Sequence, residues 1–104
     1  MSDTPLLLTL IVPDSLAEAV ADVLLAHPDL AAGFSSMPAA GHGSSIELVD
    51  AAELVSGHAE RCRFDSVCAD QAQAQAILAL VRATFPGANC YYWLTPVQAH
   101  GRLA

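Results

Sequence analysis

The chain contains no lysine, and its only basic residues are four arginines, set against eleven aspartate and glutamate residues. Its formal net charge is therefore -7 at pH 7. Proteins that bind nucleic acids need clustered basic side chains to neutralise phosphates. The composition predicts that nucleic acid is not a partner of this protein.

Long apolar runs are also missing. The run Leu6–Val12 is much shorter than the ~18 apolar residues of a membrane span, and no basic residue precedes it as in a secretory signal. The three cysteines are an odd number, which argues against a disulfide framework. These absences predict a cytoplasmic protein with no membrane insertion.

Apolar residues are abundant, because they make up 54% of the chain while charged residues make up 14%. Globular domains average about 45–50% apolar residues, and a domain of this size buries only about 60–68% of its unfolded surface. We therefore expect a single domain over residues 1–104, with surplus apolar surface that other copies of the chain cover.

The alternation of apolar and polar residues predicts four strands and two helices. The strands are expected at 6–12, 34–37, 61–68 and 90–97, and the helices at 15–26 and 70–85. The pairs Ser15/Glu18 and Asp70/Gln73 have the spacing of helix capping boxes. The order of elements is typical of an α+β, ferredoxin-like βαββαβ sandwich, with both helices on one face of a four-stranded antiparallel sheet.

The buried side of each predicted element follows from the same periodicity. The second helix is expected to bury four apolar side chains: Ile77, Leu80, Val81 and Phe85. The third strand is expected to place four residues on one face: Cys62, Phe64, Ser66 and Cys68. Cys62 and Cys68 would then lie roughly 20 Å apart, too far to chelate one ion, so we interpret them as core residues.

A polar insertion, residues 39–59, separates the second and third predicted strands. It is longer than the usual connection in a small domain, and such loops often carry function. Within it, His42 lies between Gly41 and Gly43, where the backbone is least restricted. We expect this glycine–histidine–glycine stretch to be the mobile part of the insertion, and residues 98–104 to form a flexible tail.

The insertion also carries a local helix signal. Asp50 and Glu53 have capping-box spacing, and Gly57 follows as a helix stop. Together with Glu47, these acidic residues add carboxylates to a segment that already holds His42 and His58. The sequence therefore offers this insertion as a surface for an effector or a partner protein.

Two of the histidines are candidate ligands for a divalent transition metal. Neutral imidazole suits Zn, Cu or Ni, so a site could draw on His42 and His58, with the insertion's carboxylates as further ligands. No established ligand spacing, such as CxxC or HExxH, is present. The alternative interpretation is that both histidines are simply exposed on a polar loop.

Three arginines are candidates for binding an anion. Arg61, Arg63 and Arg102 could each pair with an anionic group through bidentate contacts, although we favour the interpretation that they form ordinary surface ion pairs. The aromatic residues Tyr91 to Trp93 could stack on a base, but with so few positive charges we favour packing against the core or another subunit.

Nothing in the sequence points to catalysis. Ser44 or Ser45 beside His42 would need a third group and an oxyanion donor, and neither is indicated. We therefore expect a protein that is not an enzyme.

Three segments of the chain resemble one known family. They are Leu8–Pro13, Gly33–Ser36 together with Gly41–Gly43, and Tyr92–Val97. They look like the PII-like proteins, small trimeric signal transducers with ferredoxin-like subunits, and most closely like an uncharacterised branch often encoded beside heavy-metal efflux pumps. In that family the loop between the second and third strands, the T-loop, contacts targets or ligands. The resemblance implies a homotrimer in which residues 39–59 are the T-loop.

The chain departs from classical PII proteins in two respects. It has no lysine to cradle ATP phosphates, and both of its tyrosines lie in the last predicted strand rather than in the insertion. These differences argue against ATP as a ligand. The sequence names no other effector.

Three functions fit these observations. The first is a trimeric PII-like sensor whose insertion binds a small effector or a partner, such as a membrane transporter, in heavy-metal homeostasis. The second is a metal-binding protein for sequestration or delivery that uses His42 and His58. The third is an adaptor that docks another protein without binding a ligand.

Overall fold

The computed structural model describes residues 4–43, 53–54 and 57–104. Within this part the strands are β1 (Leu6–Pro13), β2 (Ser35–Gly41), β3 (Ala59–Cys68) and β4 (Tyr91–Pro96). A 3₁₀ turn, η1 (Asp14–Leu16), leads into helix α1 (Ala17–Leu25), and helix α3 (Gln71–Thr84) connects β3 to β4. None of the described helices is long and apolar enough to cross a membrane.

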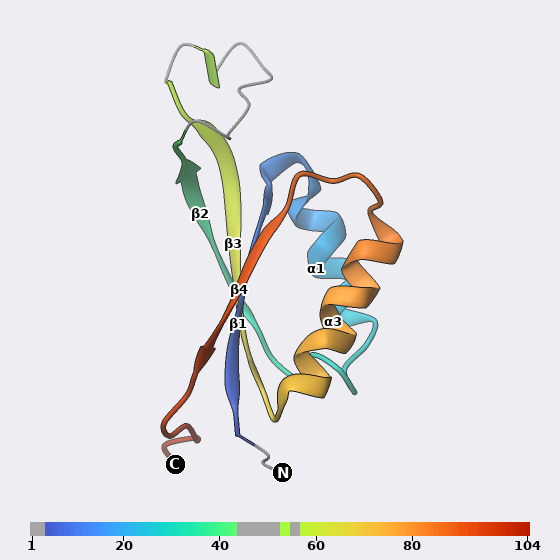
Figure 1. The fold of residues 1–104 in the computed structure, drawn as a ribbon, viewed down its shortest axis with the longest axis vertical. Coiled ribbons are helices and arrows are strands. Elements are labelled where there is room, and N and C mark those ends of the chain that lie inside the picture. Colours follow the sequence, from blue (N-terminus) through green and yellow to red (C-terminus); the bar gives the residue numbers. More distant parts are fainter. Residues whose placement is uncertain (1–3, 44–52, 55–56) are drawn as a thin grey trace.

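The strands form one antiparallel sheet in the order β2-β3-β1-β4. Both helices lie on the same face of this sheet, and no described helix or strand covers the other face, hereafter the open face (Figure 1). This arrangement confirms the predicted α+β, ferredoxin-like sandwich.

The core lies between the sheet and the two helices. The central strands contribute buried side chains such as Leu8, Leu10 and Phe64, and the helices contribute Val20 and Ile77. Cys62, Ser66 and Cys68 also face this side, as the alternation of β3 predicted. The predicted stripe on α3 is partly wrong, because Leu78 is buried where Leu80 was expected.

The two helices begin differently. At α3, the Asp70 side chain accepts a hydrogen bond from the Gln73 backbone N–H at 2.9 Å, which confirms the predicted cap. The capping box predicted at Ser15 is wrong, since α1 has no side-chain cap. The chain instead leaves β1 at Pro13 and enters the helix through the tight η1 turn.

The second strand is longer than the sequence predicted. Pro38 was expected to end it, but β2 continues to Gly41, which pairs with Ala59. Proline is tolerated here because β2 is an edge strand, where a missing N–H need not break the sheet. The excursion between β2 and β3 therefore covers residues 42–58, hereafter the 42–58 segment, and Gly41 belongs to the sheet rather than to a mobile hinge.

The ends of β2 and β3 that lead into the 42–58 segment lie at the opposite end of the sheet from the C-terminal tail (Figure 1). His100 and Arg102 belong to the tail, which is exposed and has no regular secondary structure. They are therefore remote from the side chains at the base of the 42–58 segment.

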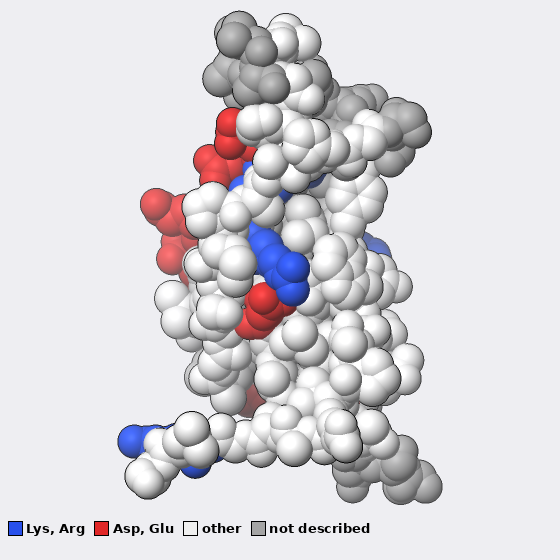
Figure 2. Space-filling model, turned by 90° about the vertical axis from the view of Figure 1, so that its left-hand side faces the viewer, with Lys and Arg blue, Asp and Glu red and all other residues white. Residues whose placement is uncertain are grey.

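The open face of the sheet is largely apolar. Figure 2 looks onto it and shows mostly uncharged side chains, with isolated basic and acidic groups among them. Met37, Val67 and Trp93 lie on this face and are 44%, 42% and 45% exposed. Large contiguous apolar patches are rare on the surfaces of monomeric proteins and often mark interaction sites.

Candidate functional site

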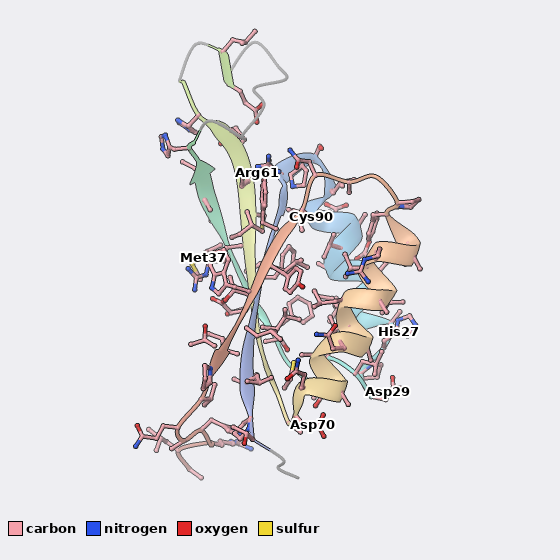
Figure 3. The ribbon with its side chains drawn as sticks, in the orientation of Figure 1. His27, Asp29, Met37, Arg61, Asp70 and Cys90 are labelled. Atoms are coloured by element: carbon pink, nitrogen blue, oxygen red, sulfur yellow. The ribbon has the colours of Figure 1, made fainter. Side chains whose placement is uncertain are left out.

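The most unusual side chain of the open face is Arg61, near the start of β3. It is only 4% exposed, and Figure 3 shows it beside the beginning of β4, close to Cys90. One terminal N–H, on Nη1, donates to the Asn89 carbonyl oxygen at 2.7 Å. The guanidinium carbon lies 5.7 Å from the centroid of the Tyr91 ring, a cation–π distance. Arg61 thus joins β3 to the loop that precedes β4.

This buried cation lacks a full set of partners. Its Nε atom is buried and has no hydrogen-bond partner in the part of the chain that the structure describes. No ion pair joins Arg61 to a carboxylate of those residues. Buried charges in proteins are ordinarily paired and fully hydrogen-bonded, because removing them from water is costly. Arg61 therefore keeps one unsatisfied buried donor, for which an anionic acceptor would be the electrostatically favoured partner.

Gly41 lies close to this nitrogen, and its lack of a side chain permits the close approach. A β-carbon built on Gly41 would lie 3.2 Å from Cγ and 3.4 Å from Nε of Arg61, and 3.3 Å from Cβ of Ala59. Any other residue at this position would therefore crowd the arginine. The end of β2 and the start of β3 together form a small cradle around Arg61 Nε, at the base of the 42–58 segment.

Two histidines flank the same base. The ring centroids of His42 and His58 are 5.5 Å apart, so the structure brings together the two residues predicted as metal ligands. His58 Nε2 also lies 3.4 Å from Glu60 Oε1. Among the described residues, no group of three or more His, Cys, Asp or Glu side chains is arranged to hold a metal ion.

Of the acidic residues predicted for the site, the structure describes only Glu53. Glu53 is buried, and its Oε2 accepts a hydrogen bond from the Glu60 backbone N–H at 2.5 Å, so it ties the segment to β3. Glu47 and Asp50 lie outside the described residues. Glu53 and Leu54 are helical, and Gly57 donates to the Glu53 carbonyl oxygen with a left-handed φ of 79°, as expected for a glycine stop.

Arg63 shares the open face with Arg61 but is already paired. Its Nε donates to both carboxylate oxygens of Asp65, at 3.2 and 3.1 Å, and its guanidinium lies 5.9 Å from the Trp93 ring centroid. Asp65 also accepts a hydrogen bond from Thr9, which is fully buried. Of the three arginines predicted to bind an anion, Arg61 retains a vacant donor, Arg63 has a carboxylate partner, and Arg102 lies at the other end of the sheet.

The cysteines are not poised for reactivity. Burial raises the pKa of all three thiols, and nearby Asp70 adds to the effect at Cys68. The positive charge of Arg61 opposes the increase in pKa at Cys90 without cancelling it. Neutral thiols at neutral pH are consistent with their interpretation as packing residues.

Sequence patterns did not reveal the roles of Gly41, Asn89 and Tyr91 at this site. Gly41 was singled out for flexibility, whereas its role is close approach to Arg61. Asn89 acts through its backbone carbonyl, which leaves no signal in the residue type. The pairing of β1 with both β3 and β4 could have indicated that Arg61 and Tyr91 meet, but only once the strand order was known.

Comparison with known proteins identifies the family. The profile of DUF3240, a protein family of unknown function, matches residues 2–104. The chain belongs to the DUF3240 family. No curated protein matches it. A DUF3240 family protein from Shewanella baltica OS155 has a similar structure over all of both chains, with 26% identity and a TM-score of 0.76.

Two further structures are PII-like. A PII-like signaling protein from Thermus thermophilus aligns over 93% of this chain and 91% of its own, with 21% identity and a TM-score of 0.60. The nitrogen regulatory PII-like protein CPII from Thiomonas intermedia K12, solved with ADP, AMP and bicarbonate, aligns over 95% and 97%, with 14% identity and a TM-score of 0.67. This DUF3240 protein therefore has a PII-like fold, as its sequence motifs indicated.

Proposed function

We propose that this protein is a non-enzymatic PII-like regulator that binds a small oxyanion at Arg61 and signals its presence through the 42–58 segment. The observation that supports the proposal most strongly is the buried, incompletely paired Nε of Arg61 beside the Gly41 cradle. A carboxylate, bicarbonate or phosphate oxygen would supply the missing acceptor through a charge-assisted hydrogen bond.

The position of this site links it to the 42–58 segment. Gly41 ends β2 and Ala59 begins β3, so both ends of the segment are attached to the strands that form the cradle. The Glu53–Glu60 hydrogen bond adds a further connection between the segment and β3. An anion that fixes Arg61 would therefore favour one arrangement of the segment, which a partner protein then recognises.

We further propose that the regulator is a homotrimer assembled through the open face of the sheet. The uncovered apolar side chains of this face support self-association. We expect three copies because the chain resembles the PII-like proteins, which are trimeric signal transducers. The regulated process would be heavy-metal homeostasis, with a membrane transporter as the partner, in keeping with the same resemblance.

Titration calorimetry on the purified assembly tests the anion site. Bicarbonate is the first probe, because CPII was solved with it, followed by phosphate, AMP, ADP and ATP. Arg61→Met should weaken oxyanion binding about tenfold or more, the value of one charged hydrogen bond. Arg102→Gln removes the same charge from the exposed tail and should leave the affinity unchanged. Equal affinity in Arg61→Met and the parent protein would refute the assignment, as would failure of every oxyanion to bind.

A divalent metal is the second candidate effector, and the 5.5 Å separation of the His42 and His58 rings favours it. Imidazoles of this spacing supply two ligands, and water or a carboxylate of another copy would complete the site. Zn, Cu and Ni titrations should show binding that His42→Ala removes and His100→Ala, in the remote tail, retains. If neither oxyanions nor metals bind, the third function, a ligand-free docking adaptor, is favoured.

A further inference from the structure

A cavity of about 180 Å³ lies between α3 and β4, on the face of the sheet opposite to Arg63 and Trp93. Its wall on the sheet includes Leu10 and Tyr92, which are paired across β1 and β4. Its wall on the helix includes Leu78, Val81 and Phe85. The cavity therefore lies mainly on the helix side of the sheet, and only Tyr91 links it to the open face.

The loop at one end of the cavity is held by two backbone hydrogen bonds of its own and by the bond from Arg61 Nη1 to the Asn89 carbonyl oxygen. The Ala88 N–H donates to the Phe85 carbonyl oxygen, and the Cys90 N–H donates to that of Ala88. Gly87 has a left-handed φ of 76°, which allows the sharp turn after the helix. Because these bonds fix the loop, the cavity is a preformed feature of the fold, as small-molecule sites usually are.

One charged side chain, Arg82, borders the cavity among the described residues that line it. Arg82 is exposed, in the last turn of α3, and has no carboxylate partner in the described part of the chain. The other lining residues with polar side chains, Cys90, Tyr91 and Tyr92, carry no permanent charge. The site thus combines an apolar interior with a single cation at its edge.

We propose that this cavity binds a small monocarboxylate whose apolar part is about the size of a benzene ring, with its carboxylate on Arg82. The volume supports this size, because a dry apolar cavity of ~150 Å³ is known to hold benzene. The charge supports the carboxylate, because guanidinium pairs with it through two parallel hydrogen bonds. This site uses a different arginine from the oxyanion site and lies on the helix side of the sheet, although Arg61 contacts Asn89 and Tyr91 at the end of the cavity.

Calorimetry of the full chain with benzoate tests the proposal, with benzyl alcohol and acetate as partial probes. Benzoate should bind more tightly than benzyl alcohol, which lacks the charge, and acetate, which lacks the ring, should not bind measurably. Arg82→Gln should reduce benzoate affinity about tenfold, the effect of losing one charged hydrogen bond. Because Arg82 is exposed, this variant should fold normally.

A second pair of variants tests the cavity itself. Ala88→Leu adds a branched side chain to its lining and should abolish benzoate binding, whereas Ala83→Leu, on an exposed position of α3, should have no effect. Unchanged affinity in Ala88→Leu, or acetate binding as tight as that of benzoate, would overturn the proposal. Bicarbonate, which lacks an apolar part, should bind Arg82→Gln as tightly as it binds the parent protein, which separates failure of this site from failure of the oxyanion site.

Discussion

Gly41 and Arg61 lie on adjacent strands at the base of the 42–58 segment, and a β-carbon on the glycine would come within 3.2 Å of Arg61 Cγ. The contact explains why a strand residue with no left-handed φ is nevertheless a glycine. It also means that a single methyl group would crowd the Arg61 side chain and shift it slightly without changing any charge.

The Gly41→Ala variant should therefore lose affinity for bicarbonate by about tenfold, as if one charge-assisted hydrogen bond were removed. Gly33→Ala is a matched control, since a β-carbon there meets nothing within 4 Å and its φ is not left-handed. That control should keep its affinity and gain about 0.4–1 kcal/mol in the free energy of unfolding. Calorimetry and urea denaturation measure both quantities. Identical bicarbonate affinities in the two variants would contradict the role assigned to the cradle.

The cap of α3 gives a second prediction. Asp70→Ala removes the acceptor for the Gln73 N–H and should lower the free energy of unfolding by about 1 kcal/mol. Asp70→Asn retains a side-chain oxygen and should recover most of this loss. Asp29→Ala changes an exposed aspartate outside the helix and should be nearly neutral. Urea denaturation followed by circular dichroism checks the three variants, and equal losses in Asp70→Ala and Asp29→Ala would exclude capping as the cause.

Much of the fold could be predicted from the sequence because local signals agreed with the tertiary structure. The alternation along β3 placed Cys62 to Cys68 correctly, and Asp70 with Gln73 marked the start of α3. Ser15 failed as a cap because the direction in which the chain leaves β1 favoured a 3₁₀ turn. Pro38 failed as a strand end because its effect depends on whether the strand is central or at an edge.

The candidate site was less predictable, since it depends on strand order and register. The three candidate arginines have the same side chain and differ only in their neighbours. Arg61 is partly paired, Arg63 is held by Asp65, and Arg102 lies in the tail. His42 and His58 were recognisable by residue type, and their closeness follows from the pairing of Gly41 with Ala59. Residue types nominated the candidates, and the antiparallel pairing of β2 with β3 decided among them.

The buried thiols give a pH prediction. Burial raises the pKa of Cys68, and Asp70 raises it further, so its folded pKa exceeds that of the unfolded chain. For such an acid, the stabilising contribution is complete below the unfolded thiol pKa, about 8.5, and is lost as the pH rises through the folded value. The free energy of unfolding should therefore decrease as the pH rises above about 8.5. Cys68→Ala should show a shallower decline in urea titrations, and an equally steep decline would assign the effect to other groups.

The last prediction concerns assembly through the open face of the sheet. Val67 is 42% exposed on this face, and an aspartate there would be driven out of water if other copies cover it. Val67→Asp should therefore reduce the mass in sedimentation equilibrium from three chains to one. Leu25→Asp adds the same charge at a 67% exposed position of α1 and should leave the mass unchanged. Emission from Trp93, the only tryptophan, should shift to longer wavelength in Val67→Asp, because dissociation returns its ring to water. A parent protein that sediments as one chain, or a Val67→Asp variant that still sediments as three, would show that this face does not mediate assembly.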